Sequence, residues 1–187
     1  DSMDKTTLSC LIGQVMERLF VEMEASGRHV HLTRQQIQML FGHDLTPVKP
    51  LSQPGQFAAK ERLDLIGPKG TLKNVAVLGP ARKEAQVEIS LTDARSLGLT
   101  VPLRQSGNVS GSPGITLVGP AGRLTISQGV IAAQRHIHLT PVDACRFGVT
   151  DQQIVKLQTF TARPLIFEDV VVRVSPEFAP RVHLDYD

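Results

Sequence analysis

The sequence is poor in aromatic residues and cysteine, and it contains no tryptophan. Of its 187 residues only 4% are aromatic, and the two cysteines are Cys10 and Cys145. Binding surfaces for single-stranded nucleic acid depend on aromatic rings that stack with bases, so this composition argues against such a function. The cysteines lie in dissimilar sequence contexts and no secretory signal peptide precedes them, so we expect a reducing, intracellular setting.

Charge and hydropathy argue against two further classes of protein. The 20 basic and 18 acidic residues are interspersed and leave a formal net charge of +2, without the like-charge run of a nucleic-acid-binding tail. No apolar stretch approaches the about 20 residues of a membrane span. We therefore expect a soluble protein with a core of aliphatic side chains. It should contact neither nucleic acid nor membrane, and any anionic ligand must bind at a local site.

Apolar residues recur at helical spacing near the N-terminus, from Leu8 to Leu19. This periodicity predicts an amphipathic helix over residues 4–19. Two roles stay open for it at this point. The helix either packs on the core of the protein, or it is a detachable peptide that docks its apolar face on a partner.

The rest of the chain has the pattern of a mainly β protein. Gly and Pro clusters such as Pro54-Gly55 and Pro113-Gly114 separate short runs of Val, Leu and Ile, which leaves no room for long helices. Strands are predicted at residues 20–25, 62–66, 75–78, 87–89, 115–118, 122–126, 154–158, 169–174 and 181–184.

A five-residue unit occurs three times in the chain. It reads HVHLT at 29–33, EISLT at 88–92 and HIHLT at 136–140, and RVHLD at 181–185 resembles it. Five of the six histidines fall within these segments, and His43, the exception, is expected at the surface or behind a ligand. The first position of each of the three copies is a potential metal ligand. This pattern indicates a metal site built by an internal repeat.

A longer repeat surrounds the short one and reads as a hairpin, a ligand-bearing strand and a short helix. Duplicated units of this kind favour two small β-barrels capped by short helices. We assign residues 1–19 to the N-terminal helix, 20–31 plus 134–187 to one barrel, and 32–133 to the other. The predicted helix starts are Thr33, Thr92 and Thr140, with Gln36 completing a capping box and Pro141 in the first turn, and the predicted stops are Gly42, Gly98 and Gly148.

The histidine pairs are incomplete metal sites. Residues two apart in a strand point to the same face, so each HxH segment presents two imidazoles side by side. Zinc needs three or four ligands, and a catalytic site leaves one position open. Glu88 aligns with the first histidine of the repeat, and His183 completes the set. We predict two metal ions in one cleft, most simply Zn²⁺, with bridging or swapped ligation left open: one on His29, His31 and Glu88, the other on His136, His138 and His183.

Two features near Glu88 suggest an anion site. Arg82 lies six positions before Glu88, and a guanidinium is the natural partner of a phosphate held beside a metal, although a surface arginine is the alternative. The loop that follows Pro102 contains Ser106 and Gly107, and its backbone amides could surround an anion. That loop lacks both the Walker spacing and the GxGxxG pattern, so nucleotide binding of those kinds is not indicated.

Together these motifs resemble a known family. The segments SGRHVHLT, QPGQFAA, QVEISLTDA, PLRQSGN and GVIAAQRHIHLTP, in this order, are similar to the PduL-type phosphate propanoyltransferases, the phosphotransacylases of bacterial microcompartments. The resemblance extends from Phe20 to the end of the chain. It implies zinc on the six predicted ligands, a phosphate contact by Arg82, and Ser106 near the phosphate or CoA.

The resemblance also implies partners and a location. The N-terminal helix is similar to an encapsulation peptide that binds shell or core enzymes of a microcompartment in the bacterial cytoplasm. That location would connect the protein with propanediol degradation. A homodimer or larger homo-oligomer is compatible with it.

The expected activity is direct transfer of a short acyl group, chiefly propanoyl, between CoA and phosphate at a di-metal site. Zn²⁺, or another divalent ion, is the expected cofactor, and CoA is a substrate or product. Two other readings stay open. One is a binuclear hydrolase of thioesters or phosphoesters that uses metal-bound hydroxide, and the other is a non-enzymatic, metal-stabilised shell or scaffold protein.

Overall fold

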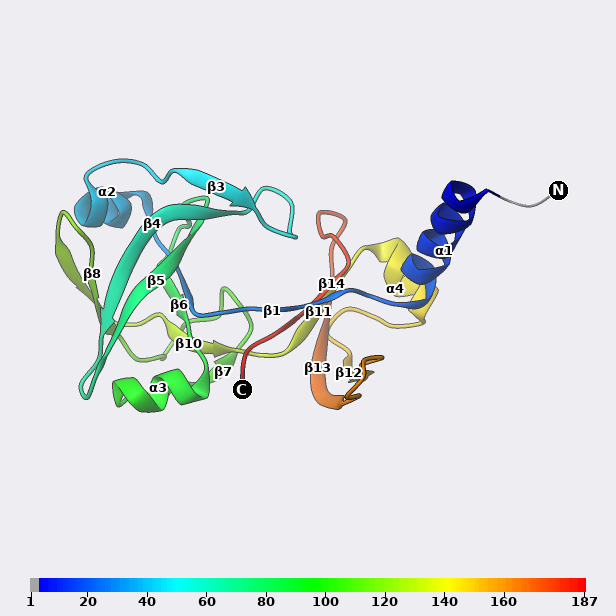
Figure 1. Cartoon of the computed structure of the whole chain (residues 1–187). Coiled ribbons are helices and arrows are strands. Elements are labelled where there is room, and N and C mark those ends of the chain that lie inside the picture. The colour runs from blue at the N-terminus through cyan, green and yellow to red at the C-terminus, as the bar shows by residue number, and fades with distance from the viewer. Residues whose placement is uncertain (1–3) are drawn as a thin grey trace. The chain divides into compact units, whose positions relative to one another are not determined.

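The computed structural model describes residues 4–187 and shows a mainly β chain with four helices (Figure 1). The predicted fold class is thereby confirmed, while residues 1–3 of the predicted N-terminal segment lie outside the described residues. The chain divides into two compact units. Unit 1 comprises the residues up to Glu24 together with His136–His183, and unit 2 comprises Ala25–Arg135 and Leu184–Asp187.

Unit 2 is built on a sheet that curls into a half-barrel (Figure 1). Its strands are β2 (His29–His31), β3 (Pro47–Pro50), β4 (Phe57–Ile66), β5 (Thr71–Gly79), β6 (Gln86–Glu88), β7 (Leu103–Arg104), β8 (Ile115–Val118), β9 (Arg123–Ile126) and β10 (Val130–Ala133). They are ordered β7-β10-β6-β2-β5-β4-β8-β9, with β3 paired to β4. The register shifts within the β4–β5 pair, and such irregularities bend a sheet.

The core of unit 2 follows the period of its strands. Along β4, Ala59, Leu63 and Leu65 are buried, whereas Lys60 and Arg62 between them are exposed. This alternation directs one face of the strand to the core. Helix α2 (Arg34–Phe41) adds Ile37, Leu40 and Phe41 to that core, and helix α3 (Leu91–Leu97) adds Ala94 and Leu97.

Unit 1 contains a smaller sheet. Its strands are β1 (Met23–Ala25), β11 (His136–Leu139), β12 (Ile154–Gln158), β13 (Ile166–Val174) and β14 (Arg181–Leu184), in the order β1-β14-β11-β13-β12. Buried residues of β13 and β14, including Val171 and Val182, fill its interior. Helix α4 (Pro141–Phe147) follows β11 directly, as the sequence predicts.

The N-terminal helix α1 (Lys5–Leu19) is confirmed within one residue. It begins after Asp4, whose carboxylate accepts hydrogen bonds from the amides of Thr6 and Thr7. None of its residues is buried, and its large apolar side chains are between 43% and 62% exposed. The alternative in which α1 packs on the core is therefore not what the structure shows. In the described part of the chain, no helix has the length and apolar character of a membrane span.

Two of the three predicted helix starts and all three glycine stops are confirmed. Thr33 and Thr140 each form a capping box, and Gly42, Gly98 and Gly148 adopt the left-handed conformation. The start predicted at Thr92 is wrong. Ser90 caps α3 instead, because its hydroxyl accepts the hydrogen bond of the Asp93 amide. In this copy of the repeat, the position of the second histidine therefore begins a helix.

The structure also corrects the assignment of the first ligand strand. We predicted residues 20–31 in the same barrel as residues 134–187, but β2 pairs with β5 and β6 and belongs to unit 2. The prediction missed β3, β7 and β10. Strand β3 begins and ends with a proline, and β7 has only two residues, so neither shows the alternating pattern of a strand.

The cap of α3 gives a testable consequence. Ser90→Ala should lower the free energy of unfolding by about 1 kcal/mol, because the Asp93 amide loses its acceptor. Thr92→Ala is the matched control and should change it by less than about 0.5 kcal/mol, since Thr92 is exposed. Urea denaturation of the variants measures both values. An equal effect of the two substitutions would contradict the observed helix start.

Candidate metal-binding site

The register between β2 and β6 assembles the first group of potential metal ligands. The two strands are antiparallel, and Glu88 lies directly opposite His29. Residues opposite each other share a face, and His31 points to that face as well because it follows His29 by two positions. All three residues are buried, and one potential ligand atom from each lies within 4.8 Å of the others. The structure thus brings together His29, His31 and Glu88 as the sequence predicts.

The second group, in unit 1, is built in the same way. In the antiparallel pair β11–β14, His183 lies directly opposite His136, and His138 shares their face. Their potential ligand atoms also lie within 4.8 Å of one another. In both groups the histidine-bearing strand lies between an antiparallel partner that supplies the third ligand and a parallel partner, β5 or β13. The internal repeat is therefore visible in the strand pairing.

The hydrogen bonding of His29 makes the space between its Nε2 and Glu88 suitable for a cation. Its Nδ1 lies 2.9 Å from the Gly27 carbonyl oxygen, which only accepts, so Nδ1 must carry a hydrogen. In the neutral ring Nε2 is then an acceptor, and it faces Glu88 Oε2 at 3.5 Å. Burial lowers the pKa of His29, but the Glu88 carboxylate and the Gly27 carbonyl outweigh it, and the pKa is raised. Two facing acceptors require a proton or a metal ion between them.

His31 and His138 also fit a metal ion. The Nδ1 atom of each is buried and has no hydrogen-bond partner in the described part of the chain. Burial lowers the pKa of His31 to about 3, with help from the charges of His29 and Arg82. Burial likewise lowers the pKa of His138 to about 3, and the charges of its neighbours His136 and His183 add to the effect. Neutral imidazoles with an unpaired nitrogen are the form that binds metals.

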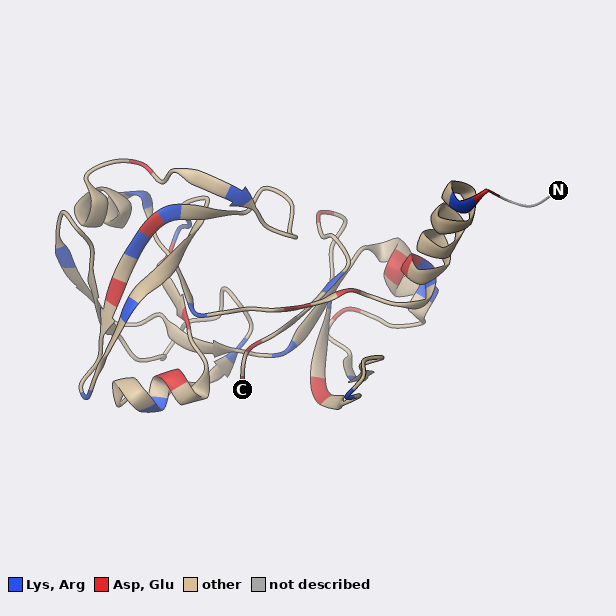
Figure 2. Cartoon of the chain, in the orientation of Figure 1, with Lys and Arg blue, Asp and Glu red and all other residues tan. Residues whose placement is uncertain are grey.

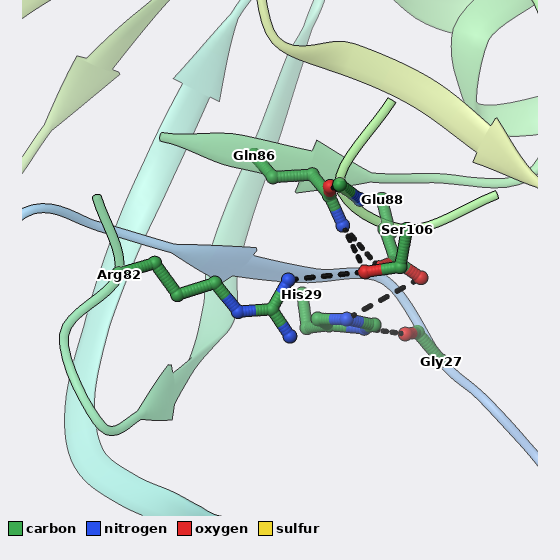
Figure 3. A network of polar contacts seen from close by, with 7 residues as sticks. Gly27, His29, Arg82, Gln86, Glu88 and Ser106 are labelled. Carbon is green, nitrogen blue, oxygen red and sulfur yellow. Dashed lines mark hydrogen bonds and ion pairs between the residues drawn. The ribbon is translucent and has the colours of Figure 1, made fainter. Parts of the chain in front are cut away.

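A polar network connects the first group to Arg82 and to the loop after β7 (Figure 3). The Arg82 Nη1 donates to Ser106 Oγ at 3.0 Å. The side-chain amide of Gln86 donates to the same oxygen at 2.8 Å and to Glu88 Oε1 at 2.5 Å. The Arg82 backbone amide donates to the Leu32 carbonyl at 2.8 Å, which fixes this segment beside the end of β2. A guanidinium and a hydroxyl thus lie next to a potential metal ligand.

The second group has different neighbours. His183 Nε2 lies 2.9 Å from Glu24 Oε1, a carboxylate–histidine pair of the kind that orients metal ligands. The ring of Phe178 packs against His138 with 4.4 Å between centroids. Arg173 lies beside His138 in the parallel pair β11–β13. None of these neighbours was predicted, because the strands and the β13–β14 connection that supply them meet His138 and His183 only through pairings that the sequence does not reveal.

The loop after β7 only partly matches its predicted role. Ser106 lies at the network, but the Gly107 amide, predicted to face an anion, donates to Gln86 Oε1 at 2.7 Å instead. Gly107 makes this possible with a φ of 94°, a conformation that favours glycine. A pocket of about 550 Å³, lined by residues 103–108 and Gln134, opens beside Ser106. A substrate could reach the hydroxyl from that side.

The remaining predictions on charge and on His43 agree with the structure. His43 belongs to neither ligand group, and its side chain is 58% exposed. Lys and Arg alternate with Asp and Glu along the chain, for example on β4 (Figure 2). Gln86 is the residue of the network that sequence reasoning missed. The sequence did hold a signal for it: Gln86 precedes Glu88 by two residues in β6, so both side chains point to the same face.

Comparison with known proteins gives a consistent result. The phosphate propanoyltransferase family matches residues 22–187. The phosphate propanoyltransferase of Enterococcus faecalis is 56% identical over 168 residues, which cover 89% of this chain and 80% of that protein. The enzyme of the same name from Thermotoga maritima is 54% identical over 87% of this chain and 79% of its own length. That from Salmonella typhimurium is 46% identical over 99% and 90%.

The family match and the relatives define the class: the protein is an enzyme, a transferase. More particularly, the chain belongs to the phosphate propanoyltransferase family. The resemblance noted in the sequence motifs is thereby confirmed.

The ligand groups generate a direct prediction about metal content. After reconstitution with Zn²⁺ and gel filtration, His31→Ala should retain roughly half of the wild-type metal, because only one three-ligand group stays complete. His43→Ala is the matched control and should retain all of it. Elemental analysis of the purified variants gives the answer. Full metal content in His31→Ala would remove this histidine from the ligand set.

Proposed function

We propose that the protein transfers a short acyl group, chiefly propanoyl, between CoA and inorganic phosphate. Membership in the phosphate propanoyltransferase family supports the reaction class. The observation that carries the proposal for this chain is the position of Arg82 and Ser106 beside the group formed by His29, His31 and Glu88. An anion contact next to a potential cation site is what phosphate binding at a metal requires.

Arg82 and Ser106 are the proposed phosphate contacts. A guanidinium donates up to five hydrogen bonds in a planar fork and remains charged at any physiological pH. Arg82 is half-buried and donates from Nη1 to Ser106, and its planar, charged guanidinium suits charge-assisted hydrogen bonds to phosphate oxygens. Ser106 borders the pocket and supplies a hydroxyl next to the guanidinium. Both groups would hold the phosphate for attack.

The six predicted ligands would hold two divalent cations, most simply Zn²⁺. The donor set of five imidazoles and one carboxylate suits zinc, and each three-ligand group leaves a coordination position open. A cation bound there supplies Lewis-acid stabilisation of oxygen and sulfur atoms that gain charge. The neutral state of His31 and His138 keeps their nitrogens available as ligands.

The proposed reaction needs no redox partner and no protein nucleophile. A phosphate oxygen attacks the thioester carbonyl carbon, a C–O bond forms, and the C–S bond then breaks. CoA leaves as the thiolate with the electron pair, and acyl phosphate is the product. Phosphate is already an anion at neutral pH, so a general base is not strictly required. Arg82 and Ser106 orient the attacking group, which converts the encounter into a reaction between positioned partners.

The exposed helix α1 suggests how the enzyme is located in the cell. Its apolar face is uncovered over the described length of the helix. We propose that this face docks on shell proteins or core enzymes of a bacterial microcompartment in the cytoplasm, in propanediol degradation. A homodimer or larger homo-oligomer of the catalytic part is compatible with this arrangement.

Phosphate-dependent release of CoA from propanoyl-CoA is the decisive measurement. Arg82→Ala should lower kcat/KM for phosphate roughly 10²- to 10³-fold, because the developing charge loses a preorganised donor. The metal content should stay at the wild-type level, since Arg82 is not among the ligands. Lys83→Ala is the matched control: it removes a positive charge from the neighbouring exposed residue and should change the rate less than about twofold.

Two outcomes would contradict the proposal. Thiol release that proceeds equally without phosphate would indicate a metal-dependent hydrolase. A complete lack of turnover by metal-loaded protein, with chelation lowering only its stability, would indicate a scaffold protein.

A further inference from the structure

A buried glutamine lies at the centre of the polar network in unit 2. Gln86 is 2% exposed and precedes Glu88 by two positions on β6, so both side chains point to the same face. In the β2–β6 register Gln86 lies directly opposite His31. A buried amide must satisfy its hydrogen bonds within the protein, and its partners therefore show what it positions.

The hydrogen bonds of the Gln86 side chain lead to functional elements of the proposed site. Its Nε2 donates to Glu88 Oε1 at 2.5 Å and to Ser106 Oγ at 2.8 Å (Figure 3). Its Oε1 accepts from the Gly107 amide at 2.7 Å. The orientation of the amide follows from these partners. A backbone N–H must face the oxygen, and an ionised carboxylate must face the nitrogen.

The first consequence concerns the proton of Ser106. Its Oγ accepts from Gln86 Nε2 and from Arg82 Nη1, and neither of these groups can accept a hydrogen bond. Both acceptor positions of the hydroxyl are thereby used. The O–H must donate in a third direction, so Ser106 is set as a donor. A donor beside a guanidinium suits an anionic oxygen such as that of phosphate.

The second consequence concerns the carboxylate of Glu88. Gln86 holds Oε1, while Oε2 faces His29 Nε2 at 3.5 Å. The carboxylate is thus turned so that one oxygen is directed to the histidines. Hydrogen-bond partners of this type fix metal ligands in their binding orientation.

We propose that Gln86 is a positioning residue that couples the cation ligand Glu88 to the phosphate contact Ser106. One amide does both tasks because its two N–H groups donate to the two elements while its oxygen holds the loop at Gly107. This role deepens the proposed function, and the part that concerns Ser106 and phosphate rests on it. The part that concerns Glu88 does not depend on the reaction, and zinc binding can test it without turnover.

The corresponding position in unit 1 supports a specific role. Arg181 lies opposite His138 as Gln86 lies opposite His31, but it forms an ion pair with Glu22. The repeat therefore does not impose glutamine at this position. An arginine there could donate to a carboxylate and a hydroxyl, but it could not accept the Gly107 amide.

Gln86→Met keeps the length of the side chain and removes its hydrogen bonds. The KM for phosphate should rise about tenfold, because the Ser106 proton is no longer directed outward. The KM for propanoyl-CoA should change less than about twofold. In chelator competition, the affinity for Zn²⁺ should fall about tenfold, the size of effect seen when the hydrogen-bond partner of a ligand is removed.

A double-mutant cycle with Ser106→Ala separates positioning from general support of the fold. If Gln86 acts through the hydroxyl, Gln86→Met should add little to the phosphate KM once that hydroxyl is gone. Independent, additive effects of the two substitutions would overturn the proposal. Gln153→Met is the control: it removes the hydrogen bond to the Thr150 amide and should leave both the phosphate KM and the zinc affinity unchanged.

Gln86→Glu provides a second variant if Gln86→Met does not fold. The introduced carboxyl group places an acceptor where Nε2 donated, so it takes the Ser106 proton and the phosphate KM should rise at least about tenfold above the wild-type value. A phosphate KM equal to that of the wild type would overturn the assignment of Ser106 as a donor.

The experiments distinguish a failure of the proposed reaction from a failure of the proposed role of Gln86. If the wild-type protein shows no phosphate-dependent turnover, the zinc affinity of Gln86→Met still tests whether Gln86 positions Glu88. An unchanged zinc affinity would overturn the role of Gln86 at the ligand group.

Discussion

The cross-strand register of β2 with β6 is the constraint on which the site depends. It places Glu88 opposite His29 and Gln86 opposite His31, so two adjacent pairs share one buried face. A slip of one residue would turn either the histidines or the acidic partner to the other face of the sheet. The pair β11–β14 obeys the same rule with His183 opposite His136. Local strand geometry thus creates both groups of potential ligands, while Arg82 and Ser106 come from segments outside these strands.

Much of this arrangement could be predicted because its signals are short-range. The strand period identified the histidine pairs, and the alignment of repeats identified Glu88. The same alignment failed at Thr92, because the equivalent of the second histidine is Ser90, which caps a helix. A residue that begins a helix cannot also continue the ligand strand. The middle copy of the unit therefore contributes one potential ligand and not two.

The other features could not be read from the chain because they arise from distant pairing. The sequence does not show that β2 joins β5 and β6, and so residues 25–31 were assigned to the wrong unit. The hydrogen bonds of Gln86 involve a loop about 20 residues further along the chain. The Gly107 amide looked available for an anion, but Gln86 already occupies it. Whether a polar group already has a hydrogen-bond partner depends on the fold and cannot be read from a motif.

The ligand groups join segments that are far apart in the sequence. β2 and β6 are separated by α2 and a long hairpin, and β11 and β14 are separated by α4 and another hairpin. Both cysteines of the chain are free. A divalent cation in each group would therefore act as a cross-link that closes a long loop, the task that disulfides perform in secreted proteins. Such ions would then hold each unit together without a covalent cross-link.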